Sequence, residues 1–159
     1  MYLTIYVDDI IIACVNLDYV REMKAKFCSQ FDMTDMDALE HFLNVRVTRS
    51  RHYIQLDQSV YTSKVLEKFV TFLGPTHRVR KSPPPSDAVD RIARVEQELS
   101  DADQTYVGNF PYRSLLGALL YLSMNTRPDV AYAVRLLSRF GSKPTLTTCH
   151  LITYLMQYV

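Results

Sequence analysis

Two adjacent carboxylates, Asp8 and Asp9, lie near the start of the chain between the apolar runs Leu3–Val7 and Ile10–Ala13. Strand-forming residues on both sides of a two-residue break predict a β-hairpin. Tight hairpin turns favour Asn-Gly or Asp-Gly, whereas two like charges at a hairpin tip repel each other. A bound divalent cation would offset this repulsion, because Mg²⁺ is held by one or two carboxylates together with substrate phosphates. The alternative is a plain solvated turn, since Asp is a common turn residue.

The chain has 159 residues, of which 48% are apolar and 22% charged. This length and composition are typical of a globular protein with one ordinary core or parts of two small ones. The formal net charge of +1 excludes a uniformly basic nucleic-acid binder. From Pro111 onward, however, five Lys and Arg residues, including Arg113 and Arg127, stand against Asp129 alone. Such a basic segment is expected either to follow a phosphate backbone, with Arg113 and Arg127 as contacts, or to form a solvated helix face.

The three cysteines, Cys14, Cys28 and Cys149, are widely spaced and odd in number. This pattern argues against a disulfide framework or a zinc site and favours an intracellular, reducing compartment, either cytoplasm or nucleus. The apolar start lacks a basic segment before it, so we expect no signal peptide. The longest apolar stretch, Leu115–Met124, is too short to span a bilayer, so no membrane association is expected.

The apolar pattern of the first half predicts two hairpins, each followed by a helix. The first hairpin covers residues 2–15, and a helix with Asp18 as N-cap follows it to Phe31. Its apolar stripe is expected to pack on the hairpin. The second hairpin covers residues 42–57, and the second helix covers residues 59–72.

The second half divides into a linker and a helical part. Residues 75–110 are acidic and contain Pro83-Pro84-Pro85, which favours an extended linker with a short helix over Arg91–Leu99. Residues 111–159 predict three helices, the first of which begins at Pro111. The domains are therefore expected at 1–74 and 111–159, with 75–110 between them.

Several segments resemble one family in the same order. Tyr6-Val7-Asp8-Asp9 matches the Tyr-x-Asp-Asp box of reverse transcriptases, and the rest of the chain resembles the copia-type LTR-retrotransposon reverse transcriptases nearly end to end. The further segments that carry the resemblance are Phe31–Met36, Leu39–Val45, Tyr53–Tyr61, Pro111–Leu122, Thr126–Val134 and Leu137–Phe140. One box would be weak support, whereas several in order are strong.

The resemblance implies an α+β fold. Residues 1–74 would form part of a polymerase palm, with the Asp8/Asp9 hairpin and a second, primer-contacting hairpin. Residues 111–159 would form a helical, thumb-like unit. Asn44 stands where the family usually has Gly, and Asn is among the residues that most readily take a positive φ.

The chemistry implied by the resemblance is two-metal nucleotidyl transfer with Mg²⁺ or Mn²⁺. Asp8 would be the main metal ligand and catalytic carboxylate, and Asp9 would assist it. Tyr6 and Val7 would lie against the template-primer. The partners in the family enzyme would be an RNA or DNA template-primer and a deoxynucleoside triphosphate.

The family's third carboxylate and its fingers lie upstream of the Tyr-x-Asp-Asp box, and its RNase H domain lies downstream. We therefore expect an RNA-directed DNA polymerase fragment that is inactive as this chain. The competing hypothesis is a decayed or domesticated, non-catalytic remnant that binds nucleic acid or protein. A weaker one is an unrelated metal-dependent phosphotransferase. The first hairpin would lack a neighbouring strand, so self-association is expected.

Overall fold

The computed structural model describes residues 1–73, 80–84 and 100–159. Within them the chain is α+β, with two small antiparallel sheets and seven α-helices. The expected helix over Arg91–Leu99 lies outside the described residues, as does most of the expected linker 75–110.

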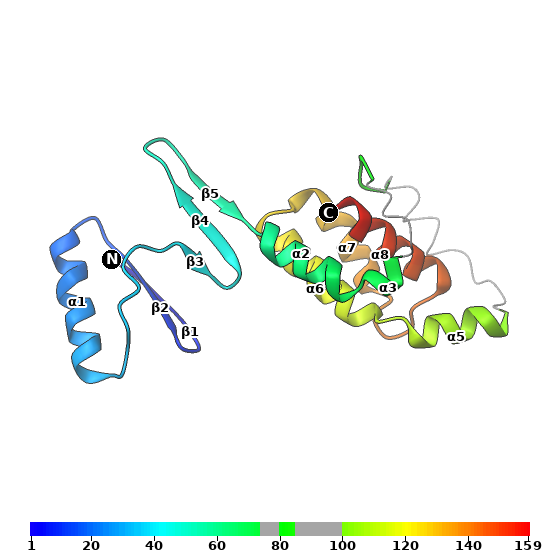
Figure 1. Ribbon diagram of the computed structural model, residues 1–159, viewed down its shortest axis with the longest axis horizontal. Coiled ribbons are helices and arrows are strands. Elements are labelled where there is room, and N and C mark those ends of the chain that lie inside the picture. The colour runs from blue at the N-terminus through cyan, green and yellow to red at the C-terminus, as the bar shows by residue number, and fades with distance from the viewer. Residues whose placement is uncertain (74–79, 85–99) are drawn as a thin grey trace. The chain divides into compact units, whose positions relative to one another are not determined.

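The chain divides into two compact units, Met1–Leu43 and Asn44–Val159. The first unit begins with the expected hairpin, in which β1 (Tyr2–Tyr6) pairs with β2 (Asp9–Ala13) (Figure 1). The turn consists of Val7 and Asp8, one residue earlier than the Asp8–Asp9 break that the sequence indicated. Asp9 is the first residue of β2 and pairs with Tyr6.

The strand register gives this hairpin one wholly aliphatic face. Leu3 pairs with Ile12 and Ile5 with Ile10, and since side chains alternate between faces these four share one side. Ile10 and Ile12 are half-buried, whereas Leu3 and Ile5 are exposed. No residue of Met1–Leu43 is buried, so the first unit has no core of its own.

Helix α1 (Leu17–Gln30) is capped by Asn16, whose side-chain oxygen accepts hydrogen bonds from the backbone N–H groups of Asp18 and Tyr19. The prediction of Asp18 as the cap is therefore wrong by two residues. None of the helix's residues is buried, so the apolar stripe is not the core that its spacing indicated. The two-residue strand β3 (His41–Phe42) lies near the end of the unit.

The second unit begins with the second expected hairpin, β4 (Val45–Arg49) and β5 (Ile54–Asp57). The helix expected over 59–72 is present in two pieces, α2 (Ser59–Lys68) and α3 (Val70–Leu73). The interruption falls at Phe69, which caps α2 at its C-terminal end and is itself buried.

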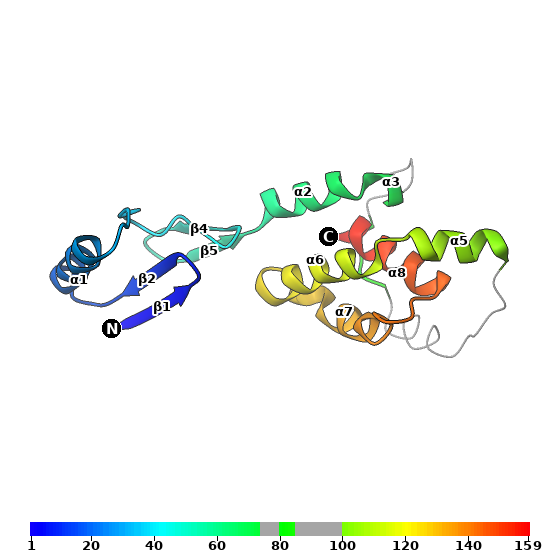
Figure 2. The same ribbon diagram turned by 90° about the horizontal axis from the view of Figure 1, so that it is seen from below.

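The three helices expected after Pro111 are confirmed, and a further helix precedes them. The elements are α5 (Asp101–Asn109), α6 (Tyr112–Asn125), a 3₁₀ turn η1 (Pro128–Val130), α7 (Ala131–Ser138) and α8 (Leu146–Tyr158). Helix α5 lies within the stretch expected as linker and packs against α8 (Figure 2). Ser100 caps α5, and a reciprocal capping box of Thr145 and Thr148 begins α8.

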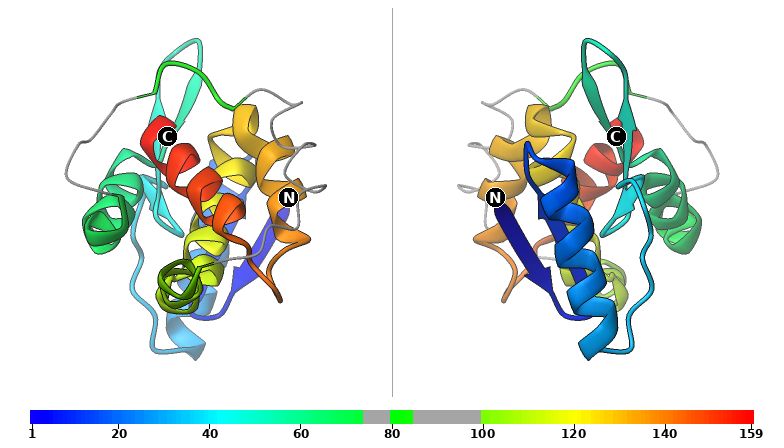
Figure 3. Two further views of the ribbon diagram at one scale, coloured as in Figure 1. Left: turned by 90° about the vertical axis from the view of Figure 1, so that its right-hand side faces the viewer. Right: turned by 90° about the vertical axis from the view of Figure 1, so that its left-hand side faces the viewer.

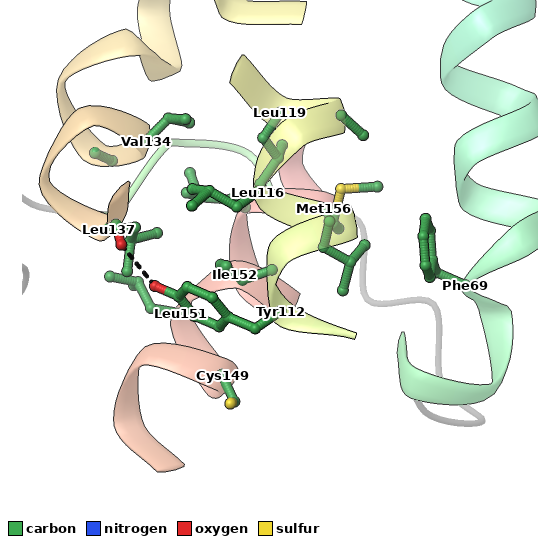
Figure 4. Packing of buried hydrophobic residues seen from close by; sticks show 14 of the residues in the cluster. Phe69, Tyr112, Leu116, Leu119, Val134, Leu137, Cys149, Leu151, Ile152 and Met156 are labelled. Atoms are coloured by element: carbon green, nitrogen blue, oxygen red, sulfur yellow. Dashed lines mark hydrogen bonds between the residues drawn. The ribbon is translucent and has the colours of Figure 1, made fainter. Parts of the chain in front are cut away.

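The core of the second unit lies around α6, which packs against η1, α7 and α8 (Figure 3). Leu115, Leu119 and Leu122 have no exposed surface and recur at helical spacing along its inner face. The Tyr112 hydroxyl donates a buried hydrogen bond of 2.8 Å to the Leu137 carbonyl, which ties α6 to α7 (Figure 4). Burial raises the pKa of Tyr112 to about 12, so this donor stays protonated at neutral pH.

No helix in the described part of the chain combines the length and the apolar character needed to cross a membrane.

Replacement of Leu119 by Ala should lower the free energy of unfolding by about 2–5 kcal/mol, because it leaves a cavity in a fully buried site. Urea unfolding followed by circular dichroism measures this change. Met124→Ala is the matched control on the same helix, since that side chain is 83% exposed, and it should cost well under 1 kcal/mol. Equal losses in the two variants would contradict the assignment of the core to α6.

Candidate metal and nucleic-acid site

The candidate metal ligands, Asp8 and Asp9, lie at the end of the first hairpin, where β1 turns into β2. Both residues are exposed, and neither carboxylate has a hydrogen bond or an ion pair with another residue that the structure describes. Unoccupied carboxylate oxygens are the ligands that hard divalent cations prefer. The pair therefore offers free oxygen ligands at the chain's surface.

The turn beside these carboxylates has a strained backbone. Val7 has a φ of 52°, and for a β-branched residue a positive φ is a genuine outlier. Such a conformation costs roughly 1–3 kcal/mol and is found mainly at functional sites. The side chains of Val7 and Tyr6, both expected at the template-primer, are 80% and 53% exposed. All four residues of the Tyr-Val-Asp-Asp box are therefore exposed, and one of them, Val7, has a strained backbone.

A third ligand is not found among the described residues, which contain no group of three or more His, Cys, Asp or Glu side chains placed to hold a metal ion. Asp35, an acidic residue of the segment that follows α1, is already engaged by Lys24 and by the backbone N–H of Asp37. These bonds lower the pKa of Asp35, the one from Lys24 most. The donors present fit an ion held by two carboxylates and further ligands from a substrate.

The second unit contains the two expected phosphate contacts, Arg113 and Arg127, and both have partners within the chain. Arg113 is exposed and donates through Nε to the Gly141 carbonyl at 2.7 Å. Arg127 donates to both carboxylate oxygens of Asp129, at 3.0 and 2.9 Å, and to the Val159 carbonyl at 2.7 Å. Each of the two guanidinium groups therefore has at least one hydrogen-bond partner within the chain.

Tyr158 completes the set of contacts around Arg127. The Arg127 guanidinium lies 4.8 Å from the centre of the Tyr158 ring, and the Tyr158 hydroxyl donates to Asp129 at 2.7 Å. The hydrogen bonds from Arg127 lower the pKa of Asp129, and the bond to Asp129 raises the pKa of Tyr158. Together these residues attach the end of α8 to the turn between α6 and α7.

Sequence reasoning missed a groove between α2 and α6. It has a volume of about 310 Å³, and its lining includes Lys64 and Lys68 from α2 and Ser114 and Ala118 from α6. The signal that could have indicated it is the spacing of the two lysines, four residues apart on an expected helix.

Residues 1–76 match the protein family described as reverse transcriptase (RNA-dependent DNA polymerase). The hairpin with its exposed Tyr-Val-Asp-Asp box lies within this match. The chain contains a copia-type reverse transcriptase region, as the order of its sequence boxes predicted.

The chain is similar along nearly all of its length to retrotransposon proteins. It is 26% identical over 162 residues to a retrovirus-related Pol polyprotein from transposon TNT 1-94 of Nicotiana tabacum, covering 99% of this chain and 12% of that protein. A similar polyprotein from transposon RE1 of Arabidopsis thaliana is 26% identical, with 100% of this chain and 10% of that protein covered. An uncharacterized mitochondrial protein of the same plant is 27% identical over 100% of this chain and 61% of its own length.

The chain thus spans about a tenth of these polyproteins and about three fifths of the mitochondrial protein. No solved structure matches it.

Arg127→Gln should destabilise the second unit at pH 7 by about 1 kcal/mol, a value reduced for the partial exposure of the ion pair. Arg127 holds the pKa of Asp129 below its ordinary value of 3.8. This contribution to stability is therefore present above that value and is lost as pH falls through the lowered pKa.

Urea unfolding of the wild-type protein and of Arg127→Gln at pH 7 and pH 2.5 measures this contribution of the ion pair to stability. The difference between wild type and Arg127→Gln should shrink at the lower pH, whereas Arg135→Gln on α7, an exposed arginine without an ion pair in the described structure, should change little at either. A difference that does not depend on pH would refute the coupling to Asp129.

Proposed function

We propose that this chain is a fragment of the RNA-directed DNA polymerase of a copia-type retrotransposon. In this proposal residues 1–74 are part of the palm and 111–159 form a thumb-like unit, and the stretch 75–110 between them contains helix α5, which packs against α8. The observation that carries it is the Tyr6–Asp9 box at a strained hairpin turn, with two exposed carboxylates that have no partner among the described residues. The match of residues 1–76 to the reverse transcriptase family supports it.

The reaction in this proposal is the attack of a primer 3′-hydroxyl on the α-phosphate of a deoxynucleoside triphosphate. Bound Mg²⁺ or Mn²⁺ would supply activation of the hydroxyl and charge stabilisation on the leaving pyrophosphate. Asp8 would provide the main metal-binding oxygens and Asp9 would add to them. Tyr6 and Val7 would contact the end of the primer, and no side chain of the protein is needed as a nucleophile.

Two carboxylates are fewer than the three that the resemblance implies for a working site. The described residues bring no third acidic or imidazole ligand to the pair. We therefore propose that a protein made of residues 1–159 alone binds metal weakly and does not extend a primer.

The metal site is tested by titrating ¹⁵N-labelled protein with Mg²⁺ and following the backbone amide shifts. We expect the amides of Val7, Asp8 and Asp9 to respond at millimolar concentration, and the response to disappear in Asp8→Asn/Asp9→Asn. Asp32→Asn is the control, because it removes an exposed carboxylate from another loop of the same unit and should leave the response intact. A hairpin that shows no shift below about 10 mM Mg²⁺ would contradict the metal assignment.

Polymerase activity is tested with a labelled primer on an RNA template in the presence of Mg²⁺ or Mn²⁺. We expect no extension by the 159-residue protein, because its carboxylate set is incomplete. Extension that is abolished by Asp8→Ala would show that the chain is a complete catalyst and overturn this part of the proposal.

The second candidate function is a non-catalytic module that binds nucleic acid or another protein, by itself or as a dimer. The aliphatic face formed by Leu3, Ile5, Ile10 and Ile12 favours it, because Leu3 and Ile5 are exposed there and an exposed apolar face is suited to a protein contact. The Asp8→Asn/Asp9→Asn variant distinguishes the two candidates. A binding module would still bind its partner in this variant, whereas a metal site would lose its response to Mg²⁺.

A further inference from the structure

The groove between α2 and α6 brings together cationic, polar and aromatic groups. Lys64 and Lys68 lie along its α2 side, and Ser114 lies on its α6 side. Tyr61 and Phe69 also line it, so its wall is partly aromatic. Because the volume is about 310 Å³, it admits a small group or a segment of a chain rather than a folded surface.

The two lysines have no acidic partner among the described residues, unlike several other basic residues of the chain. Lys24 is paired with Asp35, Lys26 with Glu22, and Arg127 with Asp129. Lys64 makes no such bond, and the Lys68 ammonium lies 5.3 Å from the centre of the Phe69 ring. Both are exposed, so their charges are available to a ligand.

The spacing of these charges suits an extended anion. Residues four apart on a helix lie on the same face and are separated by a rise of about 6 Å. Two ammonium groups arranged in this way can each meet a different charge along a polyanion. The neutral Ser114 hydroxyl, also without a partner in the described structure, can donate a hydrogen bond beside them.

One negative charge lies close to the lysines. Glu67 is exposed on the same helix, three residues after Lys64, but it does not line the groove. Its carboxylate forms no ion pair with either lysine in the described structure. It should therefore weaken anion binding without blocking it.

We infer that this groove binds the phosphodiester backbone of a nucleic acid through Lys64 and Lys68, with Ser114 as a neutral donor. The inference rests on the proposed function, which supplies the nucleic acid, and it adds the contact residues. It places phosphate contacts on α2, whereas the guanidinium groups of Arg113 and Arg127 have internal partners.

The test measures binding of a short fluorescent RNA–DNA duplex by anisotropy at several salt concentrations. Each lost phosphate contact makes the slope of log K against log salt about 0.9 less steep. Lys64→Gln/Lys68→Gln should therefore reduce the slope by roughly 1.8 and weaken binding at low salt by roughly tenfold. Glu67→Gln should strengthen binding.

The matched control is Lys81→Gln/Lys143→Gln, which removes the same charge from two exposed lysines outside the groove. It should leave the slope within about 0.3 of the wild-type value. All the substituted residues are exposed, and urea unfolding should show unchanged stability, which separates lost binding from lost folding.

The outcomes separate this inference from the proposed function. A wild-type chain that binds no duplex would overturn nucleic-acid binding altogether. A wild-type chain that binds, with equal slopes in the two double variants, would overturn the groove alone. Displacement of the duplex by polyglutamate at equal charge concentration would also overturn it, because the groove would then recognise any polyanion.

Discussion

The helical part of the chain depends on the burial of one face of α6. Leu115, Leu119 and Leu122 are fully buried there, and η1, α7 and α8 all pack against this helix. Ser114 and Ala118 each directly precede a buried leucine. The packing that fixes the leucines therefore also fixes the α6 side of the groove, so the inferred binding surface has a rigid support.

The first hairpin, in contrast to α6, has no buried face to hold it in place. No residue of Met1–Leu43 is buried, and yet Val7 takes a costly positive φ at the turn. A two-stranded hairpin is marginal in water by itself, and no fully buried residue within this unit offsets that cost. The carboxylates of Asp8 and Asp9 thus stand on a support that needs an additional surface against its aliphatic face. The lack of this surface is a physical reason why the site, although it has the family's residues, is not expected to be catalytically active in this chain alone.

Periodicity and turn residues predicted both hairpins and the helices after Pro111, whereas finer features depended on information that spacing does not contain. The structure has the turn at Val7–Asp8 rather than at Asp8–Asp9. An apolar pattern alone does not indicate which two residues lie outside the strand pairing. Asn16 and Asp18 are equally good caps by residue type, and only the hydrogen bonds decide between them. Helix α5 was missed because its own apolar face is thin, and its contacts with α8 come from distant residues.

For the candidate site, residue types indicated which side chains could bind a ligand, but they could not indicate which charges are paired within the fold. Asp8 and Asp9 were singled out because two like charges repel each other at a hairpin tip, and the family resemblance then implied a metal-binding role for them. Arg113 and Arg127 were expected to face a phosphate backbone because the segment is basic, but formal charge does not reveal a partner. The Arg127 partners include the Val159 carbonyl, 32 residues away in the sequence. The planar arginine fork suits such fixed, several-bonded contacts inside a protein, whereas a lysine on a flexible stem holds a single exposed charge. The charges available to a ligand are therefore those without an acidic partner in the described structure, and on α2 Lys64 and Lys68 are such charges.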